Sequence, residues 1–327
     1  LSENKGINLP SAPATLPALS VRDRAMLKAA RGFDVDYVAL SFVRNGADLR
    51  ILKNYLNKIK LQTGLIAKIE KPSALENIDA IMHASDGIMI ARGDLGIELG
   101  VEKVPPVQKD LIRRADCSRV PVIVATQMLE SMMDHPRPLR AEASDIANAV
   151  FDGADAMMLS GETAVGKYPR QTVRTMAAII EEAEKVVPAA GHSIEEGSVR
   201  FEEMALRSVA HAARDAAVTL RAEAIVVFTR TGLTAELVSA LRPPVPILVL
   251  TEGEKERHWL ALYRGVYGQI MRWGGDTGTA LKEADRILVK KFGIHRGASV
   301  VVVSGQDALP GMRYAVKMHR VGEMEKS

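Results

Sequence analysis

Charged and hydroxyl side chains stand at the ends of successive short apolar runs, and their types could hold a metal ion and a phosphorylated substrate. The run at 64–70 ends in Lys68 and Glu70, with one apolar residue between them. If this run is a strand, both side chains lie on one face, because side chains alternate between the two faces of a sheet. Taken alone, this pattern is more typical of a structural ion pair.

A second carboxylate, Asp94, follows the run at 86–92 within the motif ARGDLG, beside glycines that allow a ligand to approach the backbone. Two carboxylates at neighbouring strand ends suit Mg2+, which prefers oxygen ligands and takes few of them from the protein. Glu70 and Asp94 are therefore the candidate metal ligands. The alternative for Asp94 is a helix cap or a turn.

Two further motifs bring polar groups to the same edge. Thr126, in ATQMLE, offers a hydroxyl at the end of the run at 120–126, although a threonine there often only caps a helix. The run at 154–160 leads into SGET at 160–163. Polar motifs at four successive run ends favour a functional edge over chance placement.

The elements that must position these residues are β/α units. From about residue 22 to 188, amphipathic helical stretches alternate with apolar runs, which predicts a parallel sheet. Each run is apolar along most of its length, as expected for a strand buried on both faces. Strand carboxyl ends carry the chemistry both in a closed (β/α)8 barrel and in an open doubly wound sheet. The five runs are 36–42, 64–70, 86–92, 120–126 and 154–160.

A polar stretch at 188–199 predicts a boundary between one domain at 1–188 and another at 189–327. The second part predicts a smaller mixed α/β sheet with helices. Its expected helices are 200–218, one from 232, and 277–291, and its expected strands are 224–229, 246–250, 266–271, 299–304 and 315–321.

Composition excludes several classes of function. The 327 residues are 47% apolar and 25% charged, and a net charge of +3 without long like-charge runs argues against nucleic-acid or membrane-surface binding. Cys117 is the only cysteine, which excludes an intrachain disulfide and fits a reducing compartment. No apolar stretch approaches the roughly 18 to 20 residues of a membrane span, and no signal peptide opens the chain, so a cytoplasmic location is expected.

The motifs KIE, ARGDLG, ATQMLES and PRPLRAEASDIANAVFDGADAMMLSGETA, with KGINLP near the start, resemble pyruvate kinases in order and spacing over nearly the whole chain. The resemblance implies a partial TIM-type (β/α)8 barrel of about five β/α units, followed by a smaller α/β regulatory domain. It also implies transfer of the phosphoryl group from phosphoenolpyruvate to ADP, giving pyruvate and ATP in glycolysis.

The resemblance assigns roles to the residues at the strand ends. Lys68 would offset charge on the transferring phosphoryl group and on the enolate of pyruvate, and Glu70 and Asp94 would hold Mg2+. The amides near Gly93 and Asp94, with the hydroxyl of Thr126, would receive the substrate carboxylate. Thr126 would also lie on the path of the proton that reaches the enolate. Such an assignment agrees with phosphoryl transfer in general, where positioning and fixed charges supply most of the acceleration.

A loop at 229–234 offers hydroxyls and a helix N-terminus, which together suit a phosphate group. The resemblance implies that it receives the phosphate of an allosteric sugar phosphate or nucleotide. Leu233 stands where some relatives have a basic residue, so the resemblance does not identify which effector this loop would bind. The alternative is a plain helix cap. The candidate residues are Thr229, Arg230, Thr231, Gly232 and Thr234.

The resemblance begins after the small lid domain of the family, so the first three barrel strands and the ligands of the expected K+ ion would be missing. A barrel short of three strands exposes two sheet edges. Three explanations are open: a fragment, which we favour, a product completed by a separate chain, or a shortened relative without catalysis. Self-association, typically as a homotetramer, is expected from the family.

Two other functions remain open. One is a non-catalytic regulatory or assembly module of the same family, which the missing strands would favour. The other is a different barrel enzyme that handles phosphoenolpyruvate or pyruvate, such as an aldolase, against which the long SGET and ATQMLES matches argue. Mg2+-dependent binding of oxalate, which resembles the enolate, would separate a kinase from a module.

Overall fold

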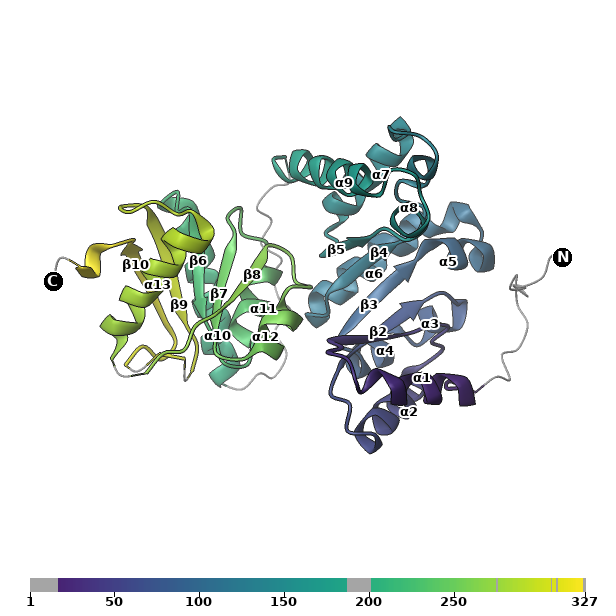
Figure 1. Ribbon diagram of the computed structural model, residues 1–327, viewed down its shortest axis with the longest axis horizontal. Helices are drawn as coiled ribbons and strands as arrows, with labels where there is room; N and C mark the ends of the chain where they lie inside the picture. Colours follow the sequence, from purple (N-terminus) through teal and green to yellow (C-terminus); the bar gives the residue numbers. More distant parts are fainter. Residues whose placement is uncertain (1–16, 187–200, 275, 307, 310, 326–327) are drawn as a thin grey trace. The chain divides into compact units, whose positions relative to one another are not determined.

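The computed structural model describes residues 17–186, 201–274, 276–306, 308–309 and 311–325 (Figure 1). The chain divides into two compact units, unit 1 at 1–186 and unit 2 at 187–327. The polar stretch at 188–199 and the KGINLP motif lie outside the described residues, so the boundary at 188/189 stays a prediction.

Unit 1 is built on five parallel strands that lie side by side in chain order. A doubly wound sheet reverses its strand order at a switch point, whereas a (β/α)8 barrel adds each strand beside the previous one. The observed order is that of successive barrel units. The strands are β1 (Tyr37–Leu40), β2 (Gly64–Ile69), β3 (Gly87–Ala91), β4 (Val122–Ala125) and β5 (Ala156–Met158).

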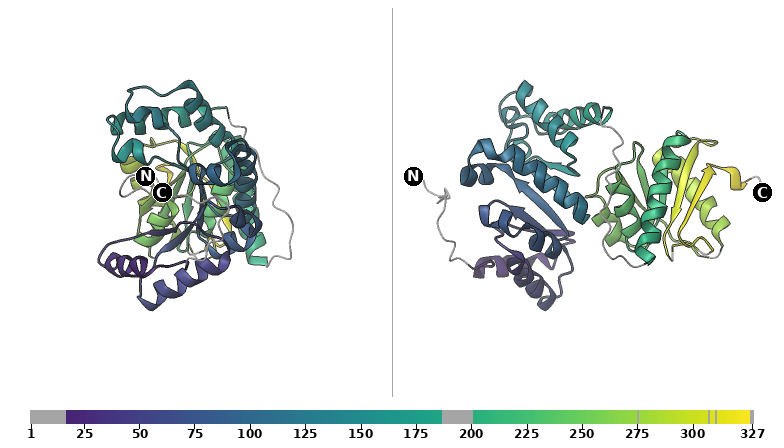
Figure 2. Two further views of the ribbon diagram at one scale, coloured as in Figure 1. Left: turned by 90° about the vertical axis from the view of Figure 1, so that its right-hand side faces the viewer. Right: turned by 180° about the vertical axis from the view of Figure 1, so that it is seen from behind.

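The large helices of unit 1 pack against one another in sequence: α2 on α4, α4 on α6, α6 on α7, and α7 on α9 (Figures 1 and 2). Such a series of neighbours forms one layer. Apolar side chains such as Leu52 of α2, Ile112 of α6 and Ile69 of β2 are buried in one core cluster. The helices are α1 (Val21–Ala30), α2 (Gly46–Lys58), α3 (Pro72–Glu76), α4 (Ile78–Ala84), α5 (Arg92–Leu99), α6 (Val104–Ser118), α7 (Arg140–Asp152), α8 (Gly161–Ala164) and α9 (Pro169–Glu184), with 3-10 turns η1 (Val101–Lys103) and η2 (Glu130–Met133).

Local signals set the ends of these helices. The side chain of Asn45 accepts hydrogen bonds from the amides of Ala47 and Asp48, which starts α2. Helix α7 ends at Gly153, whose φ of 103° lies in the left-handed region that glycine adopts most easily. The chain can therefore turn back into β5.

The prediction that every strand is buried on both faces is confirmed for β2, β3 and β4, in which nearly all residues are buried. It is wrong for β1 and β5, in which only Leu40 is buried. These two strands lie at the edges of the sheet and therefore have a neighbour on one side only.

Unit 2 contains the predicted mixed sheet, in the order β10-β9-β6-β7-β8, with β10 antiparallel and the other strands parallel. One face packs on α10, α11 and α12, and the other face packs on α13. The strands are β6 (Ala224–Phe228), β7 (Ile247–Thr251), β8 (Val266–Ile270), β9 (Ser299–Ser304) and β10 (Ala315–Arg320). The helices are α10 (Phe201–Thr219), α11 (Leu233–Ala240), α12 (Glu254–Leu260) and α13 (Thr277–Phe292), with the 3-10 turn η3 (Glu323–Glu325). No helix in the described parts of either unit has the length and apolar character needed to cross a membrane.

Candidate active site

The carboxyl ends of β2, β3 and β4 form one edge of the unit 1 sheet. Lys68 of β2 pairs with Met89 of β3, and Ala91 at the end of β3 pairs with Ala125 at the end of β4. Residues that follow these strands therefore emerge side by side. This edge is where both sheet types considered above carry their ligand sites.

Lys68 and Glu70 form the ion pair that their spacing predicts. Lys68 Nζ lies 2.6 Å from Glu70 Oε1 and donates a hydrogen bond of 2.9 Å to Ser41 Oγ. Glu70 is fully buried, and its Oε2 accepts a hydrogen bond of 2.6 Å from the amide of Phe42. Its Oε1 accepts no well-aligned hydrogen bond from any described residue and has only the charge of Lys68 beside it. A carboxylate oxygen has two lone pairs, so Oε1 keeps acceptor capacity beside Lys68.

Asp94 lies in the first turn of α5, two residues after the helix begins. Its carboxylate makes no hydrogen bond or ion pair with any other residue in the described ranges. The alternative interpretation, a helix cap, is wrong for this residue because Ala91 occupies the N-cap position. First-turn amides lack partners within their own helix, so the turn that follows β3 brings backbone donors and one carboxylate to the same short segment.

Thr126 follows β4 in an uncommon backbone conformation. Its φ is 70° and that of Gln127 is 54°, and a left-handed non-glycine residue costs about 1 to 3 kcal/mol. Thr126 Oγ1 accepts a hydrogen bond of 2.8 Å from the amide of Gly93 and donates one of 2.6 Å to the carbonyl oxygen of Ala125. The hydroxyl therefore lies against the N-terminal turn of α5 and does not cap a helix of its own.

The hydroxyls of the predicted effector loop in unit 2 are partly used within the fold. Thr229 is buried, and its Oγ1 accepts a hydrogen bond of 2.9 Å from the amide of Gly232. Gly232 has a φ of 91° and precedes α11 without a side-chain cap. Thr234 is buried against Gly305, where an added Cβ would come within 2.6 Å of Thr234 Oγ1. Neither threonine hydroxyl faces solvent.

The remaining side chains of this loop are accessible. Thr231 is exposed, and the side chain of Arg230 is 54% exposed. Arg230 Nη2 lies 3.7 Å from Oε2 of Glu252, so a bound phosphate would compete with that carboxylate for the guanidinium. The loop thus offers one cation and one free hydroxyl beside the start of α11.

Two family models match nearly the whole of this architecture. The barrel domain of pyruvate kinase matches residues 1–173, and the alpha/beta domain of pyruvate kinase matches residues 207–315. This chain belongs to the pyruvate kinase family. The family assignment made from the motifs is confirmed, as is the fold of a partial barrel followed by a smaller α/β domain.

Individual pyruvate kinases are similar over almost all of the chain. A pyruvate kinase of Mycobacterium tuberculosis is 43% identical over 99% of this chain and 68% of its own length. One of Corynebacterium glutamicum is 42% identical over 99% of this chain and 67% of its own length. The crystal structure of a pyruvate kinase from Cryptosporidium parvum superposes with a TM-score of 0.88 at 34% identity, covering 96% of this chain and 65% of that chain. The chain spans about two thirds of the length of these relatives.

No group of three or more His, Cys, Asp or Glu side chains within the described ranges is arranged to hold a metal ion. The magnesium site predicted on Glu70 and Asp94 would have two protein carboxylates. Mg2+ commonly takes one or two carboxylates and completes its shell with water and substrate oxygens. The two carboxylates of Glu70 and Asp94 fit this preference of Mg2+.

Arg92 and Asp145 were not singled out by sequence reasoning. Arg92 is buried and donates hydrogen bonds of 3.0 Å to the carbonyl oxygens of Thr126 and Gln127. Its Nη1 lies 2.6 Å from Oδ2 of Asp145. One signal was available in the sequence: Arg92 ends an apolar run, and a charged residue at a buried position needs partners.

The SGET motif joins two segments of the sheet edge. Glu162 is buried, and its carboxylate accepts hydrogen bonds from the amide of Leu129 at 3.2 Å and from that of Ser160 at 2.8 Å. It therefore ties the segment after β4 to the segment after β5. In the pyruvate kinase fold seen here, this glutamate organises backbone around the site.

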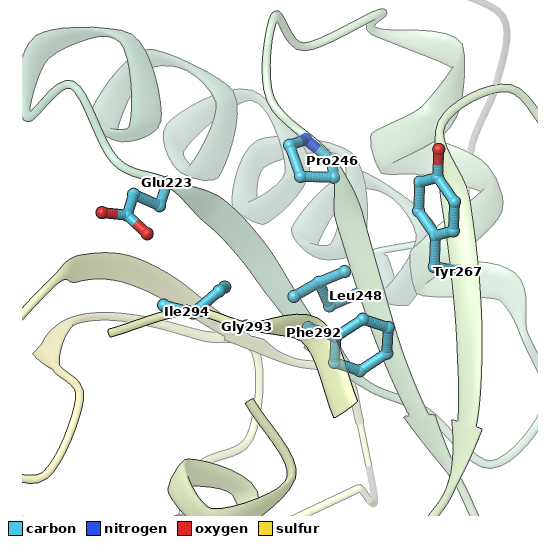
Figure 3. Close-up of a pocket in the computed structure, with 7 residues that line it drawn as sticks. All are labelled: Glu223, Pro246, Leu248, Tyr267, Phe292, Gly293 and Ile294. Atoms are coloured by element: carbon cyan, nitrogen blue, oxygen red, sulfur yellow. The ribbon is translucent and has the colours of Figure 1, made fainter. Parts of the chain in front are cut away.

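Unit 2 also has a pocket of about 460 Å³ at the start of its strands (Figure 3). It lies at the opposite strand ends from the loop at 229–234, because Glu223 precedes β6 and Pro246 precedes β7. Its walls are mainly apolar and its one charged residue is acidic, so it does not suit a phosphate. The pocket is lined by Glu223, Pro246, Leu248, Tyr267, Phe292, Gly293 and Ile294.

Proposed function

We propose that this protein transfers the phosphoryl group of phosphoenolpyruvate to ADP and so forms pyruvate and ATP in glycolysis. Family membership gives the reaction class, a phosphotransferase of the pyruvate kinase type. The observation that carries the proposal is the meeting of three groups at one sheet edge. They are the ion pair of Lys68 with buried Glu70, the carboxylate of Asp94, which has no partner among the described residues, and the hydroxyl of Thr126.

Glu70 and Asp94 would hold Mg2+, because one buried oxygen of Glu70 has only Lys68 beside it and Asp94 has no partner among the described residues. Mg2+ supplies charge neutralisation on phosphoryl and enolate oxygens. Lys68 adds a fixed cation at the same place. Its side chain is 24% exposed and is held by Glu70 and by Ser41 Oγ, so it is oriented before substrate arrives.

The amides at Gly93 and Asp94, in the first turn of α5, would bind the substrate carboxylate together with Thr126 Oγ1, once the Gly93 amide and the hydroxyl exchange their hydrogen bonds to Thr126 Oγ1 and to the Ala125 carbonyl oxygen for bonds to the substrate. The helix N-terminus favours an anion there. Transfer of the phosphoryl group leaves an enolate, which must accept a proton at carbon to become pyruvate. Thr126, at the same edge, would lie on the path of that proton.

Several finer features are proposed on the strength of the family alone. A K+ ion would serve as the monovalent cofactor, with no ligand assigned among the described residues. The protein would act in the cytoplasm as a homotetramer, which light scattering of the purified protein would test. The loop at 229–234 would bind a phosphorylated effector through Arg230 and Thr231, for which calorimetry with a sugar bisphosphate is the direct measurement.

The first experiment measures pyruvate formation from phosphoenolpyruvate and ADP with Mg2+ and K+. Lys68→Met should abolish it, because the fixed cation is lost from the reacting groups. Lys185→Met is the matched control, since Lys185 forms an exposed ion pair with Glu182 on α9 and should leave the rate unchanged. A Lys68→Met rate equal to that of the unaltered protein would refute the role of Lys68.

The second experiment tests the metal ligands without turnover. Mg2+-dependent binding of oxalate should be weakened at least about tenfold by Glu70→Gln and by Asp94→Asn, since each removes a charged ligand. Glu182→Gln is the control. Oxalate affinity that survives both substitutions would remove Glu70 and Asp94 from the metal site. An unaltered protein that binds no oxalate would point to the regulatory module instead.

A further inference from the structure

A buried arginine holds the turn that carries Thr126. Arg92 Nη2 donates to the carbonyl oxygens of Thr126 and Gln127, both at 3.0 Å, and its Nε donates to that of Thr126 at 3.3 Å. These are the two residues with left-handed φ values after β4. One planar guanidinium therefore fixes the orientation of two peptide groups in an unfavourable conformation.

The guanidinium is itself oriented from its other side. Nη1 lies 2.6 Å from Oδ2 of Asp145 in α7, and the side chain of Arg92 is only 8% exposed. A buried charge is stable only with a partner, so Asp145 keeps Arg92 in one position. Asp145 is 40% exposed, so an asparagine there keeps contact with water, while the substitution takes the countercharge away from buried Arg92.

Arg92 also begins α5, and this joins the turn to the rest of the site. The amide of the next residue, Gly93, donates to Thr126 Oγ1 at 2.8 Å, and Asp94 follows. The turn after β4 is thus bound to α5 twice, through its carbonyl oxygens and through its hydroxyl. A rotation of the peptide between Thr126 and Gln127 would break the first contact and displace the second.

We propose that Arg92 and Asp145 are positioning residues that hold the Thr126 hydroxyl where the enolate is protonated. The inference rests on the role proposed for Thr126 and deepens it. A lysine at position 92 would keep the charge but would lose the planar fork that binds two carbonyl oxygens at once. Charge alone would therefore be insufficient.

The test is the exchange of pyruvate methyl protons with D2O, followed by proton NMR with Mg2+, K+ and ATP present. This exchange requires proton transfer to and from the enolate. Arg92→Lys and Asp145→Asn should slow it by about 10- to 100-fold, the scale of a misplaced catalytic group. The control Arg113→Lys alters an exposed pair with Asp110 on α6, at 2.8 Å, and should change the rate less than about twofold.

A double-mutant cycle separates positioning from a general structural role. In a Thr126→Ala background, Arg92→Lys should slow the residual exchange less than about twofold, because no hydroxyl is left to position. Mg2+-oxalate affinity should stay within about threefold in the Arg92→Lys single variant, since Glu70 and Asp94 are unchanged. An unaltered exchange rate in Arg92→Lys, or a full loss that persists without the Thr126 hydroxyl, overturns the inference.

If the proposed function is wrong, the same measurements give a different result. In that case the unaltered protein would neither exchange pyruvate protons nor bind Mg2+-oxalate. The contact of Arg92 with the turn at Thr126 and Gln127, here called the clamp, is then tested by hydrogen exchange of backbone amides. The exchange is measured by mass spectrometry in a peptide covering 122–130. Arg92→Lys should raise exchange there relative to Arg113→Lys, and equal protection in the two variants overturns the clamp.

Discussion

Glu162 determines how firmly two segments of the sheet edge are joined. Its side chain accepts hydrogen bonds from the amides of Leu129 and Ser160, and Glu162→Ala removes both acceptors. A buried donor without a partner costs about 1 to 3 kcal/mol. Leu129 is fully buried, whereas Ser160 is exposed and can bind water instead. We therefore expect the free energy of unfolding of unit 1 to fall by about 1 to 3 kcal/mol, the cost of the Leu129 amide alone.

The assay is urea unfolding followed by two signals, because a chain of two units need not unfold in one step. Both tryptophans, Trp259 and Trp273, belong to unit 2, so their fluorescence follows that unit. Far-ultraviolet circular dichroism follows both units. Glu162→Ala should lower the midpoint of the unit 1 component by about 0.5 to 1.5 M urea, for a slope near 2 kcal/mol per molar, and leave the tryptophan transition in place.

Glu182→Ala is the matched control, since Glu182 is 73% exposed on α9 and should change stability by less than about 0.5 kcal/mol. The reasoning fails if Glu162→Ala is as stable as this control. It also fails if the tryptophan transition moves as far as the unit 1 component, because the effect would then not be local to the sheet edge.

Two further predictions concern unit 2. The hydrogen bond from Lys317 is the main cause that lowers the pKa of Glu323 from 4.5 to about 2, so the stabilisation that it gives is present above about pH 4.5 and is lost as the pH falls toward 2. The urea midpoint of Glu323→Gln should therefore fall less steeply on acidification than that of the unaltered protein, by a small amount because the carboxylate is 39% exposed; equal slopes would contradict this. Arg230→Ala should weaken sugar bisphosphate binding about tenfold or more in calorimetry, as the loss of a charged hydrogen bond implies. Arg286→Ala, on the exposed face of α13, should not, and equal affinities in the two variants would remove the loop from the effector site.

Much of unit 1 could be predicted because its sequence signals agree with one another. Apolar runs bounded by polar motifs gave the five strands, and the alternation with helices gave parallel pairing. The order β2-β3-β4 places Lys68, Glu70 and Thr126 at or just after the carboxyl ends of strands in one parallel sheet, which is the arrangement that the alternation of strands and helices predicts. The ion pair between Lys68 and Glu70 also followed from the two-residue period of a strand.

The rest depended on features that no local pattern encodes. The exposure of β1 and β5 depends on which strands have a neighbour on both sides. The role of Arg92 depends on the left-handed turn at Thr126, which is unusual for a β-branched residue, and on Asp145, which lies far along the chain in α7. Glu162 was interpreted as one of the polar groups at the rim, but its carboxylate turns inward to backbone amides.

The two units differ in the length of chain that lies between paired strands, and therefore in the entropy lost when those strands come together. In unit 1 each strand pairs with the one made just before it, as Gly64 of β2 does with Tyr37 of β1. In unit 2 the central strand β6 pairs with β9, so that Ala224 meets Val300 only after two more strands and their helices have been synthesised. Each doubling of a closed loop costs only about 0.6 kcal/mol, so the longer closure hardly affects equilibrium stability. Its consequence is kinetic: the unit 1 sheet can form strand by strand as the chain leaves the ribosome, whereas β6 at the centre of the unit 2 sheet lacks one neighbour until β9 has emerged.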